Sequence, residues 1–147
     1  MPESAMSRTA NAEARVASGD PLDVRSFSAK QGINQLFAIE LSVVSKSLDI
    51  DFDQVIGDEA SFSLATRRST MSWSGICREM EQHRVDEKGL ARYRLVTVPA
   101  FWLLTQRNNY RVFQYLSEIE IVQKILGEGG VEHEVRVDSA AHGKRKF

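Results

Sequence analysis

Hydrophobic and polar residues alternate with a period of two through most of the chain, a pattern typical of half-buried β-strands. The clearest run is LFAIELSVV, in which Phe37, Ile39, Leu41 and Val43 share one face. Similar alternation predicts further strands near residues 22–28, over 60–66 and 70–84 as a hairpin, from residue 90 onward, and over 131–137. We therefore expect strands to outnumber helices and short polar turns to join them.

Three short stretches interrupt the alternation and predict helices over 51–57, 99–106 and 117–130. Gly57 is placed to end the first helix, and Gly89 suits a turn that needs a positive φ angle. The third helix is the clearest, because Ser117 and Glu120 have the spacing of a capping box. The chain is predicted to be an α+β protein, strand-rich, with a bent or split β-barrel and two or three short helices.

The length of 147 residues corresponds to about one domain. Residues 1–20 are small and polar and predict a disordered or loosely attached N-terminal arm. Residues 21–138 carry the patterned sequence and are expected to form the barrel domain. Residues 139–147 lack periodicity and predict a flexible basic tail.

The alternation and the apolar cluster FWLL at 101–104 together predict the core. The expected core residues are Phe37, Ile39, Leu41, Trp73, Tyr93, Trp102, Leu103, Phe113, Ile121 and Ile125.

Composition narrows the function classes. The net charge is −1, so no overall field draws the molecule to nucleic acid or to anionic lipid. The single cysteine, Cys77, excludes an intrachain disulfide. No apolar run approaches the ~20 residues of a membrane span, and the N-terminus lacks the apolar region of a secretory signal peptide.

Candidate metal ligands do not occur at a recognised spacing; they are Cys77, His83, His133 and His142. The acidic run Asp49, Asp51 and Asp53 resembles the start of a calcium loop but lacks the bidentate glutamate at its twelfth position. GEGG at 127–130 follows a helix and so cannot cradle phosphate at a helix start. We therefore predict no catalytic, cofactor-binding or metal-binding residues, with an enzyme using Cys77 and His83 as a weak alternative.

Nucleic-acid binding is the stronger alternative. Arginines alternate with aromatic residues around Arg107, Tyr110, Arg111 and Phe113, and exposed aromatics on a sheet can stack on bases. The slightly acidic balance and the inward position expected for most of these aromatics argue against it. A small strand-rich nucleic-acid-binding module therefore stays as the alternative to a structural module.

A series of short motifs occurs in a fixed order over roughly residues 22–137. Its members are Phe37 and Leu41; Gly57; Gly75 and Ile76; Gly89, Leu90 and Tyr93; Pro99, Trp102, Leu103 and Leu104; Arg111, Phe113 and Gln114; Glu118 and Ile119. This series resembles the N-terminal part of VgrG proteins, the trimeric spike components of bacterial type VI secretion, which are related to the hubs of contractile phage tails.

The resemblance implies a hub barrel of the phage-tail type and a mechanical role in puncture and delivery. It implies a homotrimer that caps a tube of Hcp hexamers, with no catalysis, no cofactor, no nucleic acid and no membrane span. It further implies a cytoplasmic protein that is exported through the type VI apparatus. The second barrel and the spike of the family do not follow in this sequence, so we expect a truncated hub module.

Overall fold

The structure, a computed structural model, describes residues 10–146 and has two compact units. We call the part that ends at Pro99 the sheet unit and the part that begins at Ala100 the C-terminal unit. The patterned sequence over 21–138 therefore does not form one continuous domain, because the strand-rich core ends where the first α-helix begins.

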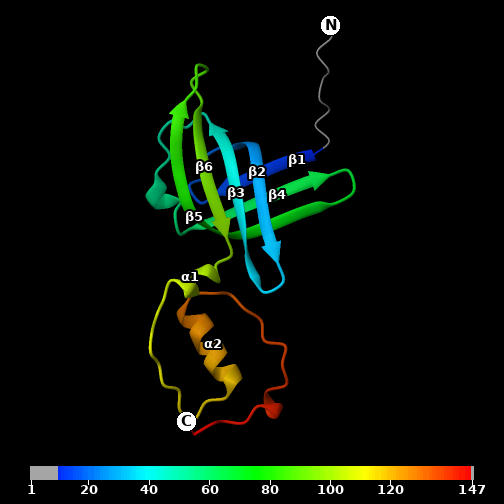
Figure 1. Ribbon diagram of the computed structural model, residues 1–147, viewed down its shortest axis with the longest axis vertical. Coiled ribbons are helices and arrows are strands. Elements are labelled where there is room, and N and C mark those ends of the chain that lie inside the picture. Colours follow the sequence, from blue (N-terminus) through cyan, green and yellow to red (C-terminus); the bar gives the residue numbers. More distant parts are fainter. Residues whose placement is uncertain (1–9, 147) are drawn as a thin grey trace. The chain divides into compact units, whose positions relative to one another are not determined.

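The sheet unit is built on one antiparallel sheet of six strands (Figure 1). The strands are β1 (Ala10–Val16), β2 (Asp23–Gly32), β3 (Gln35–Ser45), β4 (Glu59–Thr66), β5 (Thr70–Val85) and β6 (Ala91–Val98). Their order across the sheet is β1-β4-β5-β6-β3-β2. The helix expected over 51–57 is only one 3-10 turn, η1 (Phe52–Gln54), after which Gly57 has a φ of 90°.

Strand β1 falls within the arm that was expected over residues 1–20. It pairs with β4 in a register that places Ala14 opposite Phe62. Ala14 and Val16 are buried although both side chains are small. The expectation of an arm down to residue 20 was wrong for β1, because small apolar residues at alternate positions suffice for an edge strand against a larger partner. Residues 1–9 of that arm lie outside the described residues.

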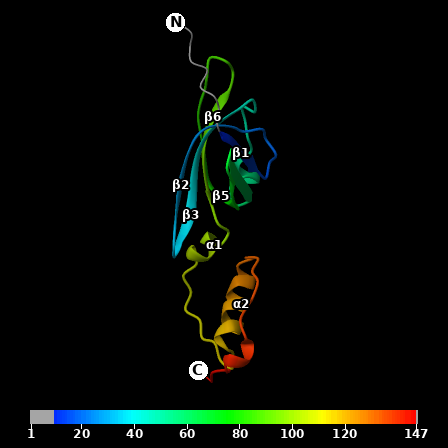
Figure 2. The ribbon, with the colours of Figure 1, turned by 90° about the vertical axis from the view of Figure 1, so that its right-hand side faces the viewer.

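The sheet curls into a half-barrel. Phe27 of β2 and Phe62 of β4 have ring centroids 5.0 Å apart, although three strands separate β2 from β4 in the sheet. The Nε1–H of Trp73 donates a hydrogen bond of 2.8 Å to Oε1 of Gln31, which also joins β5 to β2. Figure 2 shows β2 and β3 on one side of this unit and β1 on the other. The space between these two sides holds the core.

The bend that allows this curl lies in β5, at Gly75. The residues up to Ile76 pair with β4, and those from Ile76 to Val85 pair with β6. A Cβ atom on Gly75 would lie 2.0 Å from the carbonyl oxygen of Val98, so only glycine fits there. The absence of a side chain thus permits one strand to change partners.

Among the described residues, all buried apolar side chains belong to the sheet unit. Ile39, Leu41 and Tyr93 are fully buried, and Trp73 is 8% exposed. Phe37 is partly buried and packs against the same cluster. The Tyr93 hydroxyl donates to the carbonyl oxygen of Ser47 at 2.8 Å, which satisfies the one polar atom of this buried ring.

The C-terminal unit contains α1 (Trp102–Thr105), α2 (Glu118–Glu128) and a 3-10 turn, η2 (Ser139–Ala141). Ser117 and Glu120 form the capping box of α2: the Ser117 side chain accepts from the Glu120 N–H, and the Glu120 carboxylate accepts from the Ser117 N–H. The segment 131–137 is not a strand, and the expectation of one was wrong. Alternation favours an extended backbone, but a strand also needs a neighbour for its hydrogen bonds, and none pairs with it among the described residues.

The tail expected to be flexible is partly held by α2. Arg145 and Leu116 form an antiparallel bridge, and the Lys144 ammonium lies 3.2 Å from the Glu120 carboxylate. Arg145 also forms an ion pair with Glu118. Basic residues of the tail therefore meet the acidic first turn of α2, an attraction that composition alone did not reveal. Residue 147 lies outside the described residues.

Candidate assembly surfaces

The C-terminal unit carries large apolar side chains that it does not bury. Ser117 is the only buried residue of this unit among those described, and α2 has no buried residue. Trp102, Leu103, Phe113 and Ile121, expected in the core, are only partly buried. Ile125, expected with them, is 36% exposed. A unit of this composition lacks the closed core of an independent domain.

Most of the exposed large apolar residues of this unit lie either in the segment before α2 or in α2 and the segment after it. Tyr110 and Val112 project from the extended segment before α2 and are 105% and 85% exposed. Val122 of α2 and Val135 of the segment after it line a groove of about 330 Å³. Single exposed apolar residues are common on monomers, but several together mark a surface for a partner.

The short helix α1 packs within this unit through Leu104. A Cβ atom on Gly129 would lie 2.5 Å from Cδ2 of Leu104, so the glycine lets this leucine approach the end of α2. The FWLL cluster therefore belongs partly to a helix-to-helix contact and partly to the surface, since Phe101 is 46% exposed.

The arginines near the aromatic residues have protein partners. Arg111 forms an ion pair with Glu128 at the end of α2, and its guanidinium lies 5.0 Å from the centre of the Phe113 ring. Arg107 donates to the Glu128 carbonyl oxygen at 3.3 Å, at the negative end of the helix dipole. These bonds attach the segment 107–113 to α2. The arginines beside the aromatic residues therefore have a structural role, which argues against a base-stacking surface.

The sheet unit ends in two strand edges, β1 and β2, and no ladder joins them in the described part of the chain. Nine of the ten residues of β2 are exposed, Val24 being the partly buried one. At the tip of the β2–β3 hairpin, Ile33 is 94% exposed and Asn34 has a φ of 58°. A long exposed edge is a ready template for a further strand.

Charged residues of the outer sheet face form a compensated network around Arg94 of β6. Its Nε donates to Glu40 of β3 at 2.8 Å, and its Nη1 lies 3.5 Å from the carboxylate of Glu79 on β5. The hydrogen bond from Arg94 lowers the pKa of Glu40 below its ordinary value, so that carboxyl stays ionised. Ion pairs therefore link the three neighbouring strands β3, β6 and β5 on this face.

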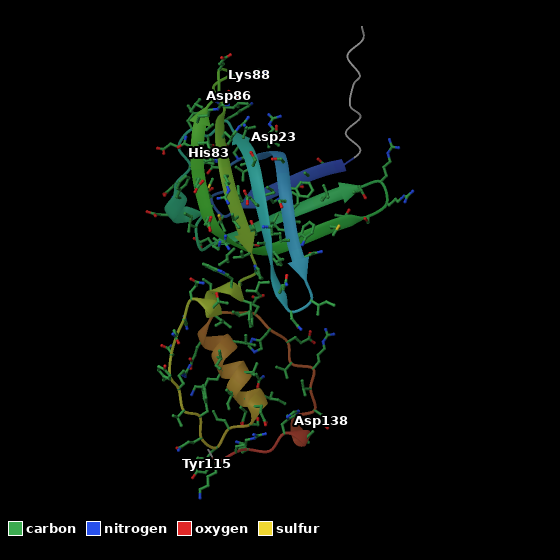
Figure 3. The ribbon with its side chains drawn as sticks, viewed as in Figure 1. Asp23, His83, Asp86, Lys88, Tyr115 and Asp138 are labelled. Atoms are coloured by element: carbon green, nitrogen blue, oxygen red, sulfur yellow. The ribbon has the colours of Figure 1, made fainter. Side chains whose placement is uncertain are left out.

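The residues considered for catalysis are not brought together. Cys77 is fully buried in the core, and burial raises the pKa of its thiol from 9.0 to about 11. His83 is exposed six residues further along β5 (Figure 3), about 20 Å for an extended strand. A buried thiol with a raised pKa is a poor nucleophile.

His133 and His142 belong to the C-terminal unit, whereas Cys77 and His83 belong to the sheet unit. Within residues 10–146, no three His, Cys, Asp or Glu side chains gather closely enough to hold a metal ion. No helix in the same range has the length and apolar character needed to cross a membrane.

Exposed sheet edges and exposed apolar side chains on a curled half-barrel are typical of proteins that associate with other chains. The chain belongs to the phage tail baseplate hub (GPD) family, whose family model matches residues 30–147. The VgrG resemblance of the sequence is thereby confirmed.

Two curated relatives from Pseudomonas aeruginosa are similar to the chain. The type VI secretion system spike protein VgrG4b is 33% identical over 110 residues, which cover 75% of this chain and 13% of the relative. The spike protein VgrG1a is 28% identical over 111 residues, covering 73% of this chain and 17% of the relative. The chain therefore matches less than a fifth of the length of these spike proteins.

A solved structure shows the same fold. The E. coli c3393 protein, described as a component of the type VI secretion system with structural similarity to the T4 bacteriophage tail proteins gp27 and gp5, superposes with a TM-score of 0.71 at 18% identity. The match covers 91% of this chain and 37% of that protein. At this identity the likeness concerns the fold, which is strand-rich, curled and poor in helices.

Proposed function

We propose that this chain is the first hub barrel of a type VI secretion spike, a structural part without catalysis. In this role three copies associate into a ring that caps the tube of Hcp hexamers. The family and the relatives support a spike role, and the surfaces described above supply the means of association. The protein would be made in the cytoplasm and leave through the apparatus that it helps to build.

The observation that carries the proposal is the unburied apolar surface of the C-terminal unit. Tyr110 and Val112 are almost fully exposed, and α2 buries no residue. Transfer of apolar area out of water stabilises by about 25 cal/mol per Å², so such a surface favours a protein partner. A module that has strand edges and apolar surface but no enclosed reactive group is suited to assembly.

The test is the solution mass of the 147-residue chain by light scattering over a concentration series, together with its retention on an immobilised Hcp-type ring. We expect a defined oligomer, retention on the ring, or both. A Tyr110→Ser/Val112→Ser variant should weaken these interactions, whereas Asn109→Ser, an exposed polar control in the same segment, should not. A chain that has the mass of one copy throughout and does not bind the ring would contradict the proposal.

A further inference from the structure

The outer face of the sheet unit contains a hollow of about 580 Å³ at the end that carries the β5–β6 turn. Four basic residues line it, Arg25, Arg84, Lys88 and Arg92, together with Asp86 and Glu87 of the turn. Figure 3 shows Asp86 and Lys88 at this end, with Asp23 nearby at the start of β2. We call this site the basic hollow.

The basic hollow contains more positive than negative charge among the described residues, since four basic residues line it against Asp86 and Glu87. Arg84 and Arg92 stand directly opposite each other on β5 and β6, an arrangement that destabilises a sheet. Within residues 10–146, neither they nor Lys88 forms a salt bridge, and Arg25 pairs only with Asp23, at 3.0 Å. Arg94, on the same face of β6, has three carboxylates within 4 Å.

Asp86 offsets only part of this charge: its carboxylate attracts Lys88 and Arg92, but the hollow is lined by four basic residues, and the same carboxylate also holds the turn. One of its oxygens accepts from the backbone N–H groups of Lys88 and Leu90, each at 2.9 Å. Asp86 and Glu87 also give the rim a negative charge. These rim carboxylates disfavour a phosphate backbone, in which every repeating unit is charged, more than a protein segment whose carboxylates are separated by neutral residues.

The same unit exposes a segment of opposite charge. Residues 47–66 contain no lysine or arginine and five acidic residues: Asp49, Asp51, Asp53, Asp58 and Glu59. All five are exposed, and none of them forms a salt bridge within the described part of the chain. We call residues 48–59 the acidic segment. Leu48 and Ile56 within it are 50% and 43% exposed, and Val85 beside the hollow is 48% exposed, so both surfaces combine charge with apolar area.

We propose that the basic hollow of one copy receives the acidic segment of a neighbouring copy. Because the net charge is only −1, the attraction arises from segregated charges and not from an overall field. Two different patches of one chain that recognise each other make a head-to-tail contact, which closes into a ring if the rotation between copies permits. This inference rests on the proposed function and names a contact that would build the hub.

The test uses two charge-reversed forms of the full chain and a control. One is Arg84→Glu/Arg92→Glu; the other is Asp49→Lys/Asp58→Lys, whose side chains form no hydrogen bond or salt bridge within the described residues. The control, Arg67→Glu/Arg68→Glu, makes the same charge change at the β4–β5 turn. Self-association is measured by sedimentation equilibrium at about 0.01 M and about 0.15 M ionic strength, where screening lengths are ~30 Å and ~8 Å. Circular dichroism verifies that each form is folded.

At low salt we expect each reversed form alone to associate at least about tenfold more weakly than the natural chain. Mixing the two forms should restore association, since each negative hollow then meets a positive segment and each positive hollow meets a negative one. The control should associate as the natural chain does. Restoration on mixing is the result that a purely structural effect of the substitutions would not produce.

Three results would overturn the inference. The first is undiminished association of Arg84→Glu/Arg92→Glu while Tyr110→Ser/Val112→Ser abolishes it; the proposed function would then stand with another contact. The second is failure of the mixture to recover. The third is binding of a single-stranded oligonucleotide that the Arg84→Glu/Arg92→Glu form loses with its self-association unchanged. A natural chain that neither associates nor binds an Hcp-type ring would remove the proposed function as well.

Discussion

Substitution of Gly75 by alanine tests the idea that one glycine permits the sheet to curl. The added Cβ would lie 2.0 Å from the carbonyl oxygen of Val98, 2.8 Å from its carbonyl carbon and 3.0 Å from Cα of Pro99. All three are backbone atoms, so no side-chain rotation can relieve the clash. A carbon and a carbonyl oxygen approach to ~3.3 Å at closest, so the end of β6 must move by more than about 1 Å.

That movement would act on Ile76↔Val98, the first pair of the β5–β6 ladder. Overpacking usually costs about 1–3 kcal/mol and sometimes more, and a backbone clash belongs at the upper end. Alanine recovers about 0.4–1 kcal/mol by restricting the unfolded chain. We therefore expect Gly75→Ala to lower the free energy of unfolding by about 2–3 kcal/mol, a large share of the 5–15 kcal/mol typical of a domain.

The assay is urea unfolding followed by far-ultraviolet circular dichroism. Gly32→Ala is a matched control in the same unit, because a Cβ there meets first the Gln35 side-chain oxygen at 3.2 Å, which can rotate away. We expect the control to change the free energy of unfolding by less than about 0.5 kcal/mol. An unfolding midpoint for Gly75→Ala equal to that of the natural chain would refute the claim that β5 must approach the end of β6 so closely.

Three further predictions concern buried or capping groups. Thr97 is fully buried and its hydroxyl has no partner among the described residues, so Thr97→Val should raise the free energy of unfolding by about 1 kcal/mol; a lower urea midpoint would mean that the hydroxyl is bonded. The thiol of Cys77 keeps its proton in the folded state up to a pKa of about 11 and loses it near 9.0 when unfolded, so stability should fall by about 1.4 kcal/mol per pH unit across this window; an equal slope in Cys77→Ala would contradict this. Ser117→Ala removes a capping bond of α2 and should cost about 1 kcal/mol, seen as lost helical ellipticity on mild heating, and unchanged ellipticity would show that the cap is dispensable.

Some of the candidate surfaces were foreseeable from the sequence. The acidic residues of 47–66, a stretch without lysine or arginine, and the arginines of β6 can be read from the sequence. That Arg84 and Arg92 face each other could not be foreseen, because register shifts between Cys77 and Glu79 and between Gln82 and Arg84 change the alternation within β5. Each shift moves the following side chains relative to the partner strand.

The exposure of the C-terminal unit was also not foreseeable. Ile121 and Ile125 stand at helical spacing and Trp102 lies in the apolar cluster FWLL, and both patterns predict buried side chains without indicating what buries them. The pattern indicates that an apolar face favours burial, but it does not indicate whether the burying surface belongs to the same chain or to a partner. The mistaken strand over 131–137 has the same origin, because its alternation says nothing of a neighbour.

Local signals in the sequence alone therefore determined where strands β2 to β6 lie, where α2 begins at Ser117 and where Gly57 and Gly89 turn the chain. These features depend on contacts between residues a few positions apart or on the φ angles of single residues. The tertiary structure alone decided that β1 is a strand, that β5 changes partners at Gly75, that the chain divides after Pro99, and which charges stand unpaired. Those outcomes depend on contacts between residues far apart in sequence. Such contacts form only once the strand order and the curvature of the whole sheet are established.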